Sequence, residues 1–352
     1  RRQRQMCIRD RMKKSLMTLG VLALFVLMAY GQEKKFALYS VAFYNMENLF
    51  DTIHDEGKND YEYLPNGTNQ WNTMKYKAKL KNMSEILSML STDKLPMGPA
   101  IIGVSEIENY RVLEDILKQP ALADRGYQYV HYEGADQRGV DCAFFYNPKL
   151  FELTNSKLVP YVYINDTVHK TRGFLIASGN IAGEKMHFIV NHWPSRAATS
   201  PARERAGEQV RAIKDSLLRE DSAAKIVIMG DMNDDPMDKS MAVALGAKRK
   251  PADVGPTDLY NPWWDTLKKG YGTLMYKGKW NLFDQIVFTG NLLGTDRSTL
   301  KFYKHEIFRR DFMFQKEGKY KGYPKRTQAG GVWLNGYSDH LPTIIYLIKE
   351  VK

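Results

Sequence analysis

Short apolar runs rich in Val, Ile and Phe recur along the whole chain and are separated by polar and helical stretches. Such runs are typical of buried β-strands. The runs that predict strands cover residues 36–44, 100–104, 142–146, 186–191, 225–229, 285–289 and 343–348. Strands that alternate with helical stretches over this length predict an α/β fold.

Two of the intervening stretches have the period of an amphipathic helix. In the first, Leu80, Met83 and Leu87 share one face, and Thr73 can cap the start. The second covers residues 203–219 and repeats apolar residues at similar spacing. We therefore expect an α/β sandwich of two sheets with helices outside.

The chain shows no internal repeat and no low-complexity linker, which favours one domain over residues 32–352. Two long segments, residues 51–72 and 309–337, are polar or Gly-rich and predict surface insertions. Cys142 lies among apolar residues, so we expect it in the core and not as a nucleophile.

Residues 1–31 have the pattern of upstream residues followed by a secretory signal peptide. A basic start at residues 12–14 precedes an apolar run at 16–28, and small residues follow at 29–31. The run is shorter than the ~20 residues that span a membrane. We expect export to the periplasm or the medium without stable membrane insertion after cleavage; a retained N-terminal anchor is the alternative.

The charge of the chain is compatible with a phosphate-bearing partner. The whole chain carries +11, and residues 1–31 contain seven Lys or Arg and one Asp. Removing these six net charges leaves +5 on the remainder. A modest positive charge favours anionic partners but does not identify one.

Small polar clusters stand next to the predicted strands. They cover residues 45–48, 105–109, 191–193, 230–235, 283–285 and 338–340. One such cluster is usually a cap or a turn, but a fold does not need carboxylates and His at so many strand ends. Strands sharing a sheet edge would bring the clusters into one cleft. Their oxygens suit Mg²⁺, and their His residues can transfer protons or stabilise an oxyanion.

The order and wording of these clusters resemble the endonuclease/exonuclease/phosphatase superfamily, which includes DNase I-like nucleases, sphingomyelinases and inositol-polyphosphate phosphatases. The most specific pieces are Gly-Asp-Met-Asn at residues 230–233 and Ser-Asp-His at residues 338–340. The resemblance extends from Asn45 to His340. It implies a four-layered α/β sandwich, DNase I-like, and a metal-dependent hydrolase of phosphoric ester bonds.

The resemblance also implies a role for each matching position. The implied metal ligands are Asn45, Glu106 and Asp339, for Mg²⁺ with Mn²⁺ as a substitute. The implied catalytic residues are His192, Asp231, Asn233, Asp284 and His340. In this scheme Asp284 orients His340, and Asp231 with Asn233 positions the attacking water. Arg138 is the implied contact to substrate phosphate, with Asp141 as the alternative.

The implied function is an exported phosphodiester hydrolase, and a nuclease, in particular an endonuclease, is favoured. Arg196, Arg203 and Arg205 follow the His192 strand and could meet nucleic-acid phosphates. The alternative for these arginines is a solvated helix face. Neither the choice of DNA or RNA nor the oligomeric state follows from the sequence.

Two other functions compete with a nuclease. A phosphodiesterase or phosphatase could act on a lipid or a small phosphate ester, as sphingomyelinases do, with Trp71, Trp263 and Trp264 entering the membrane interface. A non-catalytic binding protein of the same fold is the other alternative, and it is disfavoured because no core motif residue is missing.

Overall fold

The computed structural model describes residues 34–164 and 168–351. Residues 38–349 form one compact unit. The described residues outside this unit lie at its two ends, where Lys34 Nζ donates a hydrogen bond to Glu350 Oε2 at 2.8 Å.

The predicted signal peptide falls outside the described residues and remains a prediction, as does a single domain over residues 32–352. Within the described ranges, no helix is both long and apolar enough to cross a membrane.

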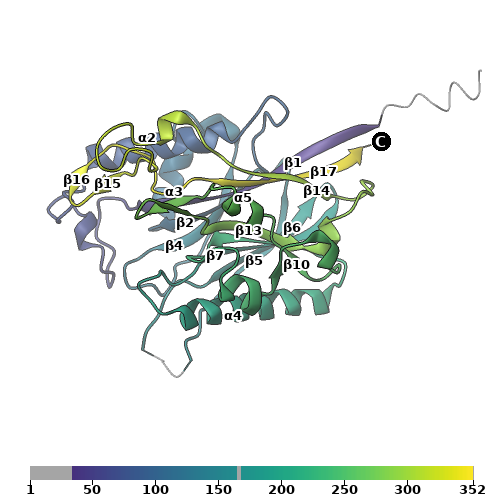
Figure 1. Cartoon of the computed structure of the whole chain (residues 1–352). Coiled ribbons are helices and arrows are strands. Elements are labelled where there is room, and N and C mark those ends of the chain that lie inside the picture. The colour runs from purple at the N-terminus through teal and green to yellow at the C-terminus, as the bar shows by residue number, and fades with distance from the viewer. Residues whose placement is uncertain (1–33, 165–167, 352) are drawn as a thin grey trace, which may run out of the picture. The chain divides into compact units, whose positions relative to one another are not determined.

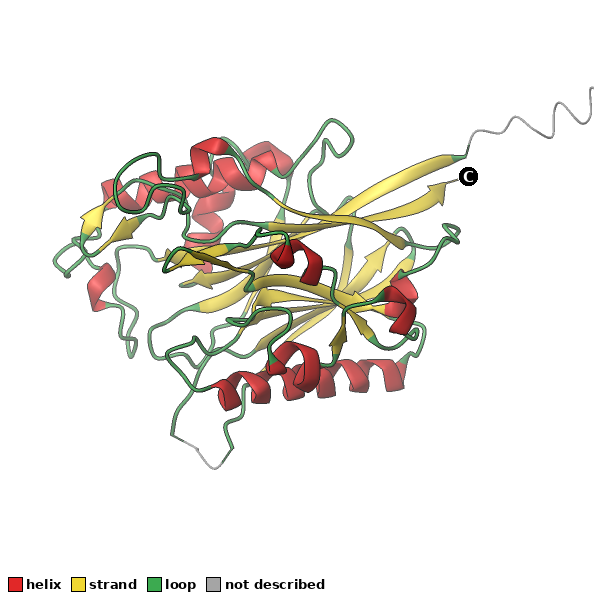
Figure 2. Ribbon diagram, in the orientation of Figure 1, coloured by secondary structure: helices red, strands yellow, loops and turns green. Residues whose placement is uncertain are grey.

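A mixed β-sheet forms one of the two inner layers (Figures 1 and 2). In order across this sheet, its six described strands are β14 (Lys301–Ile307), β17 (Thr343–Val351), β1 (Lys35–Leu49), β2 (Ile101–Ile107), β4 (Asp141–Tyr146) and β3 (Gln128–His131). Strands β1 and β2 are parallel, whereas β4 is antiparallel to β2 and to β3. The first strand of the chain therefore lies in the interior of its sheet.

The second sheet forms the other inner layer. Its seven described strands are, in order, β5 (Glu152–Val159), β6 (Phe174–Ile181), β7 (Glu184–His192), β8 (Lys225–Asp231), β13 (Asp284–Thr289), β10 (Leu259–Tyr260) and β9 (Ala247–Lys248). Two small hairpins pair β11 (Leu274–Tyr276) with β12 (Lys279–Asn281), and β15 (Gln328–Ala329) with β16 (Val332–Trp333).

The apolar core between the sheets comes from alternate residues of the strands. Val41 and Phe43 of β1 and Phe188 of β7 belong to this core and are fully buried. Gly103 of β2 lets the sheets approach closely, because a Cβ there would lie 2.5 Å from the Met229 sulfur of the second sheet. The two sheets are therefore packed face to face.

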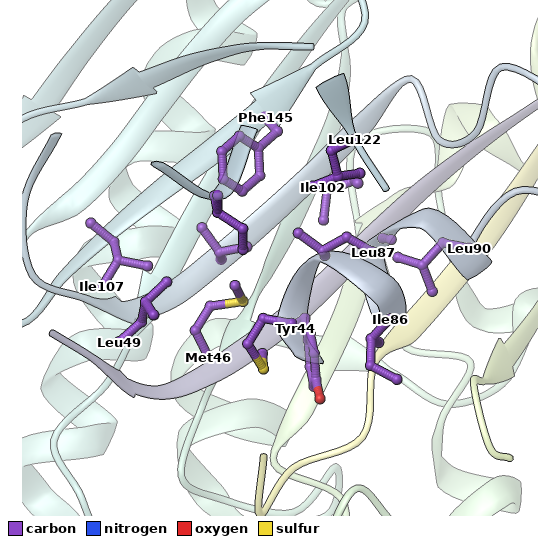
Figure 3. Packing of buried hydrophobic residues seen from close by; sticks show 14 of the residues in the cluster. Tyr44, Met46, Leu49, Ile86, Leu87, Leu90, Ile102, Ile107, Leu122 and Phe145 are labelled. Atoms are coloured by element: carbon purple, nitrogen blue, oxygen red, sulfur yellow. The ribbon is translucent and has the colours of Figure 1, made fainter. Parts of the chain in front are cut away.

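Helices cover the outer faces of both sheets (Figure 1). The α-helices are α2 (Thr73–Met89), α3 (Tyr110–Leu117), α4 (Ser200–Glu220) and α5 (Trp264–Lys268). Helices α2 and α3 pack on the first sheet, where Leu87 joins Tyr44, Ile102 and Phe145 in one cluster (Figure 3). On the second sheet, Val210 of α4 belongs to another cluster.

Six short helical turns complete the described elements. They are η1 (Tyr61–Tyr63), η2 (Ala123–Arg125), η3 (Ser240–Leu245), η4 (Pro251–Asp253), η5 (Gly290–Leu292) and η6 (Asp311–Met313). Turns η1 and η6 lie in the two segments predicted as insertions.

The four-layered sandwich and all seven predicted strands are confirmed, and Cys142 is buried as predicted. The cap of α2 was predicted one residue too late. Asn72, not Thr73, is the N-cap, and its side chain accepts the backbone N–H of Lys75 at 3.1 Å. Strands β3, β5 and β14 were not predicted, because polar and apolar residues mix along these partly exposed strands.

Replacing Phe188 by Ala is expected to lower the free energy of unfolding by about 3–5 kcal/mol, because it opens a cavity between the sheets. Phe188 is fully buried, and its ring meets that of Phe151 edge-on at 5.4 Å. Urea denaturation measures the change. Tyr303→Ala on β14, where the side chain is exposed, is the control and should change little. Equal effects of the two substitutions would contradict the assigned core.

Candidate active site

A row of polar residues continues the apolar inner face of the second sheet. On β7, Val190 faces the core between the sheets, and His192 is the next residue on that face. On β8, Met229 is followed on the same face by Asp231. Strand pairing places His192 beside Asp231, and Asp231 beside Asp284 of β13. The two-residue period of strands therefore aligns three predicted site residues across three adjacent strands.

Asn45 connects this row to the first sheet. Its Nδ2 donates to Asp231 Oδ2 at 3.0 Å and to Glu106 Oε1 at 3.1 Å. Its amide oxygen accepts the backbone N–H of Glu47 at 2.8 Å, and Asn48 N donates to the second oxygen of Glu106 at 2.9 Å. Because Asn45 is fully buried, one amide fixes two carboxylates from opposite sheets.

Glu106 reaches the site because β2 becomes irregular at its end. The pairing with β4 shifts register between Ser105 and Ile107, and Glu106 has a left-handed backbone with φ of 58°. In a regular strand its side chain would point toward α2, as Val104 does. The bulge redirects the carboxylate toward the row. Asn233, after β8, is also left-handed, with φ of 51°, and such strained residues often stand at functional sites.

His340 and Asp284 form the buried pair that the sequence predicted. The His340 Nδ1 lies 2.7 Å from Asp284 Oδ2. Burial alone would lower the pKa of His340, but the Asp284 and Asp231 carboxylates outweigh burial and raise it well above its usual value. Ser338 holds the turn, donating to Asn45 O at 2.8 Å and accepting His340 N at 3.1 Å. His340 is therefore an oriented imidazolium at neutral pH.

Asp231 can exchange a proton near neutral pH. Burial raises its pKa, His340 opposes this rise and Asp284 adds to it, so that the pKa is about 7. Asn233 N donates to Asp231 Oδ1 at 2.9 Å, while the Asn233 side chain donates to Trp193 O at 3.0 Å. The carboxylate is thus held in place by its own turn and has the pKa that a general base needs.

His192 is neutral, in contrast to His340. Burial lowers its pKa well below the usual value, and the positive charges of Arg172 and Arg138 lower it further. Its Nε2 lies 3.8 Å from Glu106 Oε1 and 3.7 Å from Asp231 Oδ2. Its Nδ1 is buried without a hydrogen-bond partner in the described chain. A neutral imidazole here can donate to a substrate oxygen without carrying charge.

Asp339 joins the site through residues that the sequence did not predict. Arg326 Nη2 lies 2.9 Å from Asp339 Oδ2, and Arg326 Nε donates to Glu47 Oε1 at 2.8 Å. Fully buried Lys79 lies 3.8 Å from Glu47. Burial and the charge of Asp339 raise the pKa of Glu47 to about 7 despite both cations. Asp339 Oδ1 lies 3.9 Å from His340 Nε2, so Asp339 borders the row.

Arg138 lies at the edge of this arrangement. Its side chain is 52% exposed, with Nε 3.5 Å from Asp136 Oδ1. No hydrogen bond or ion pair within the described ranges joins it to another predicted site residue. Arg172, which was not predicted, is buried and donates to Asp136 at 2.9 Å and to Trp193 O at 3.0 Å. Both arginines are close enough to His192 to influence its pKa.

Asp141, the alternative to Arg138, has other partners. Its Oδ2 accepts the backbone N–H of Gly134 at 3.0 Å and lies 3.2 Å from His131 Nε2. This buried carboxylate is held by the turn before β4, and its negative charge would repel a phosphate.

The arginines after His192 are occupied by carboxylates of the protein. Arg196 pairs with Asp238 at 2.8 Å, Arg203 with Asp234 at 2.9 Å and Arg205 with Glu208 at 3.3 Å. Arg203 is also buried and donates to two backbone carbonyls. The expectation that these arginines offer a basic surface to nucleic acid is therefore wrong.

The donor set fits a divalent cation. Two groups of three offer ligand atoms within 4.8 Å of one another, namely Glu106 with His192 and Asp231, and Asp231 with Asp284 and His340. The side chains of Glu106 and Asp339 are 17% and 24% exposed, which leaves them open to solvent at the edge of a buried site. The raised pKa of Asp231 indicates an excess of negative charge that a cation would neutralise.

Comparison with known proteins agrees with this geometry. A model of the Endonuclease/Exonuclease/phosphatase family matches residues 40–349. No curated protein sequence matches the chain.

Solved structures share the fold at low identity. An endonuclease/exonuclease/phosphatase family protein from Bacteroides thetaiotaomicron is 15% identical with a TM-score of 0.56, covering 91% of this chain and 98% of that one. A mannosyl-6-phosphatase from the same organism is 14% identical with a TM-score of 0.54, covering 88% and 99%. D. rerio TDP2 complexed with a single-strand DNA product gives the same identity, TM-score and coverages.

Replacing Asp284 by Asn is expected to lower the pKa of His340 in metal-free protein, because the nearest carboxylate is lost while burial remains. NMR titration of the histidine ring signals measures the shift, with His305 as an internal control outside the site. A raised folded pKa stabilises the protein fully below the unfolded value of about 6.5, and this stabilisation disappears as pH rises through the folded value. The loss of unfolding free energy in the variant should therefore be largest at low pH. An unchanged His340 titration would contradict the pairing.

Proposed function

The chain belongs to the endonuclease/exonuclease/phosphatase family, and from that premise we propose that it is an exported, Mg²⁺-dependent phosphodiester hydrolase acting on nucleic acid. Hydrolysis of phosphoric esters is the activity of this family, and the chain is an enzyme of that class. The observation that carries the proposal is the aligned row of His192, Asp231 and Asp284 with His340 paired to its end.

In the proposed reaction, Asp231 takes a proton from water as the water oxygen attacks phosphorus and the P–O ester bond breaks. Its pKa of about 7 suits proton uptake at neutral pH. Asn233 fixes the Asp231 carboxylate through its backbone N–H. The His340 imidazolium donates a charge-assisted hydrogen bond to a non-bridging oxygen, and neutral His192 supplies a second donor.

A divalent ion held by Glu106 and Asp339, with Asn45 beside it, would supply Lewis-acid stabilisation of the charge that grows on the phosphate. Asn45 holds Glu106 at a fixed place relative to Asp231. Arg326, bound to Asp339, adds a positive charge at the same edge. Mg²⁺ is proposed because every one of these ligands is an oxygen.

The nucleic-acid substrate is proposed in preference to a lipid. Trp71 and Trp263, the candidates for insertion into a membrane interface, are fully buried, and Trp264 is only partly exposed. Their rings pack inside the unit and cannot enter a bilayer. D. rerio TDP2, which shares the fold, was solved with a single-strand DNA product. Export is proposed on the signal-peptide pattern of residues 1–31 alone.

Replacing His340 or Asp231 by Ala is expected to reduce hydrolysis at least ~10²–10³-fold, the usual loss for one preorganised group of this kind. Initial rates on an oligonucleotide measure the loss. His169→Ala, which removes an exposed histidine outside the site, is the matched control and should hydrolyse normally. Circular dichroism and thermal melting establish that each variant folds. Turnover close to the unmodified protein in either site variant would refute the assigned mechanism.

Removing divalent ions with EDTA is expected to abolish activity, and Mg²⁺ or Mn²⁺ should restore it. The full chain is assayed on plasmid DNA, RNA, sphingomyelin and bis-p-nitrophenyl phosphate. Nicking of DNA or cleavage of RNA that disappears with EDTA supports the proposal. Hydrolysis of sphingomyelin or a small ester alone would replace the nuclease with the lipid or small-ester alternative. Inactivity on every ester would revive the non-catalytic binding protein.

A further inference from the structure

A basic pocket of about 400 Å³ lies in the insertion that follows β14. Arg309, Arg310, Lys316 and Lys321 line it, with Asp311 as the lining carboxylate. The lining thus carries three net positive charges. A volume of this size can accept a ligand group and not only water.

The four cations of this pocket have no acidic partner. None of them forms an ion pair with a described residue, whereas the arginines after His192 all do. Within the described ranges, the hydrogen bond given for the Arg310 guanidinium is to the backbone oxygen of Arg309, at 2.8 Å. Uncompensated positive charge gathered in a concave surface attracts anions.

Arg309 is held rigidly by aromatic rings. Its guanidinium carbon lies 5.4 Å from the ring centre of Tyr271, 4.8 Å from that of Trp280 and 5.0 Å from that of Phe314. Its Nη1 is buried without a hydrogen-bond partner in the described chain. Cation–π contacts place the charge but leave donors unused, and an unused buried donor is costly. The side chain is thus preorganised to bind an anion.

The pocket is joined to the catalytic centre by one hairpin. Leu274 of β11 forms a β-bridge with His340. At the other end, Gly278 N donates to the Tyr323 hydroxyl at 2.6 Å, and the Trp280 ring lies 6.3 Å from that of Phe314 in the pocket wall. A ligand extending from His340 along this hairpin would therefore reach the pocket.

Exposed aromatic side chains accompany this path. Tyr271 is 50% exposed and Tyr276, on the hairpin, is 62% exposed. Basic grooves with exposed rings bind single-stranded nucleic acid, because phosphates pair with the cations and unpaired bases stack on the rings. A duplex keeps its bases stacked internally and gains nothing from these rings.

We propose that Arg309, Arg310, Lys316 and Lys321 bind a backbone phosphate of a single-stranded nucleic acid whose scissile phosphodiester lies at His340. The proposal rests on the proposed nuclease function and adds a second phosphate subsite to it. A substrate with one phosphate can occupy the catalytic centre but cannot reach the pocket. The pocket therefore favours strands over small esters.

The test compares the double variant Lys316→Gln/Lys321→Gln with the unmodified full chain. Binding of a fluorescent single-stranded oligonucleotide is measured by anisotropy in EDTA at several salt concentrations. Each lost phosphate contact on a single strand lowers the slope of log K against log salt by about 0.7, so the double variant should lose about 1.4. In Mg²⁺, its KM for the oligonucleotide should rise, while turnover of bis-p-nitrophenyl phosphate should not change.

Lys94→Gln/Lys149→Gln is the matched control, since both lysines are exposed and lie beyond the strand ends opposite the site. An unchanged slope and KM in the pocket variant, with normal cleavage of the oligonucleotide, would overturn the subsite and leave the nuclease standing. An equal effect on duplex binding would overturn the assignment to single strands. If the unmodified protein hydrolyses no ester, the proposed function fails, and a reduced slope in the pocket variant would still support the subsite.

Discussion

The site depends on the two-residue alternation of the strands that form the core between the sheets. The inward positions of β7, β8 and β13 are apolar over most of their length and turn polar at one edge, as His192, Asp231 and Asp284. Their carboxylates therefore border a dry core, where charges interact strongly because water does not screen them. A shift of one residue in any of these strands would turn its polar group to the outer face.

This burial makes the balance of charge the main property of the site. Asp231 and Asp284 lie in adjacent strands, and their proximity is tolerated because His340 is protonated between them and Asn45 donates to Asp231. Separate contacts with Arg326 and Lys79 offset the negative charge of Glu47 and Asp339 at the neighbouring edge. The basic pocket of the insertion has the opposite imbalance, with cations that lack carboxylates. Excess negative charge that suits a metal and excess positive charge that suits phosphates thus occupy separate regions.

Much of this could be predicted from the sequence, because strand runs and the residues beside them are local patterns. The pairing of Asp284 with His340 was predicted from the family resemblance and is present. Arg326 was not predicted, because it meets Glu47 across 279 positions of sequence and lies in a loop without periodicity. Glu47 stood in the first polar cluster but carried no sign of burial. The insertion at 309–337 was expected to be only a surface addition, yet it supplies both Arg326 and the pocket.

The position of β1 has a consequence for folding. In the first sheet β1 lies between β2, formed early in the chain, and β17, formed last. The catalytic groups extend from Asn45 to His340, so contacts of long sequence separation complete the site, and such contacts form late in folding. A growing chain that has not yet produced β17 lacks His340 and leaves one edge of β1 unpaired. Synthesis can therefore yield most of the sandwich before any hydrolytic activity exists, which delays the enzyme until its last strand is in place.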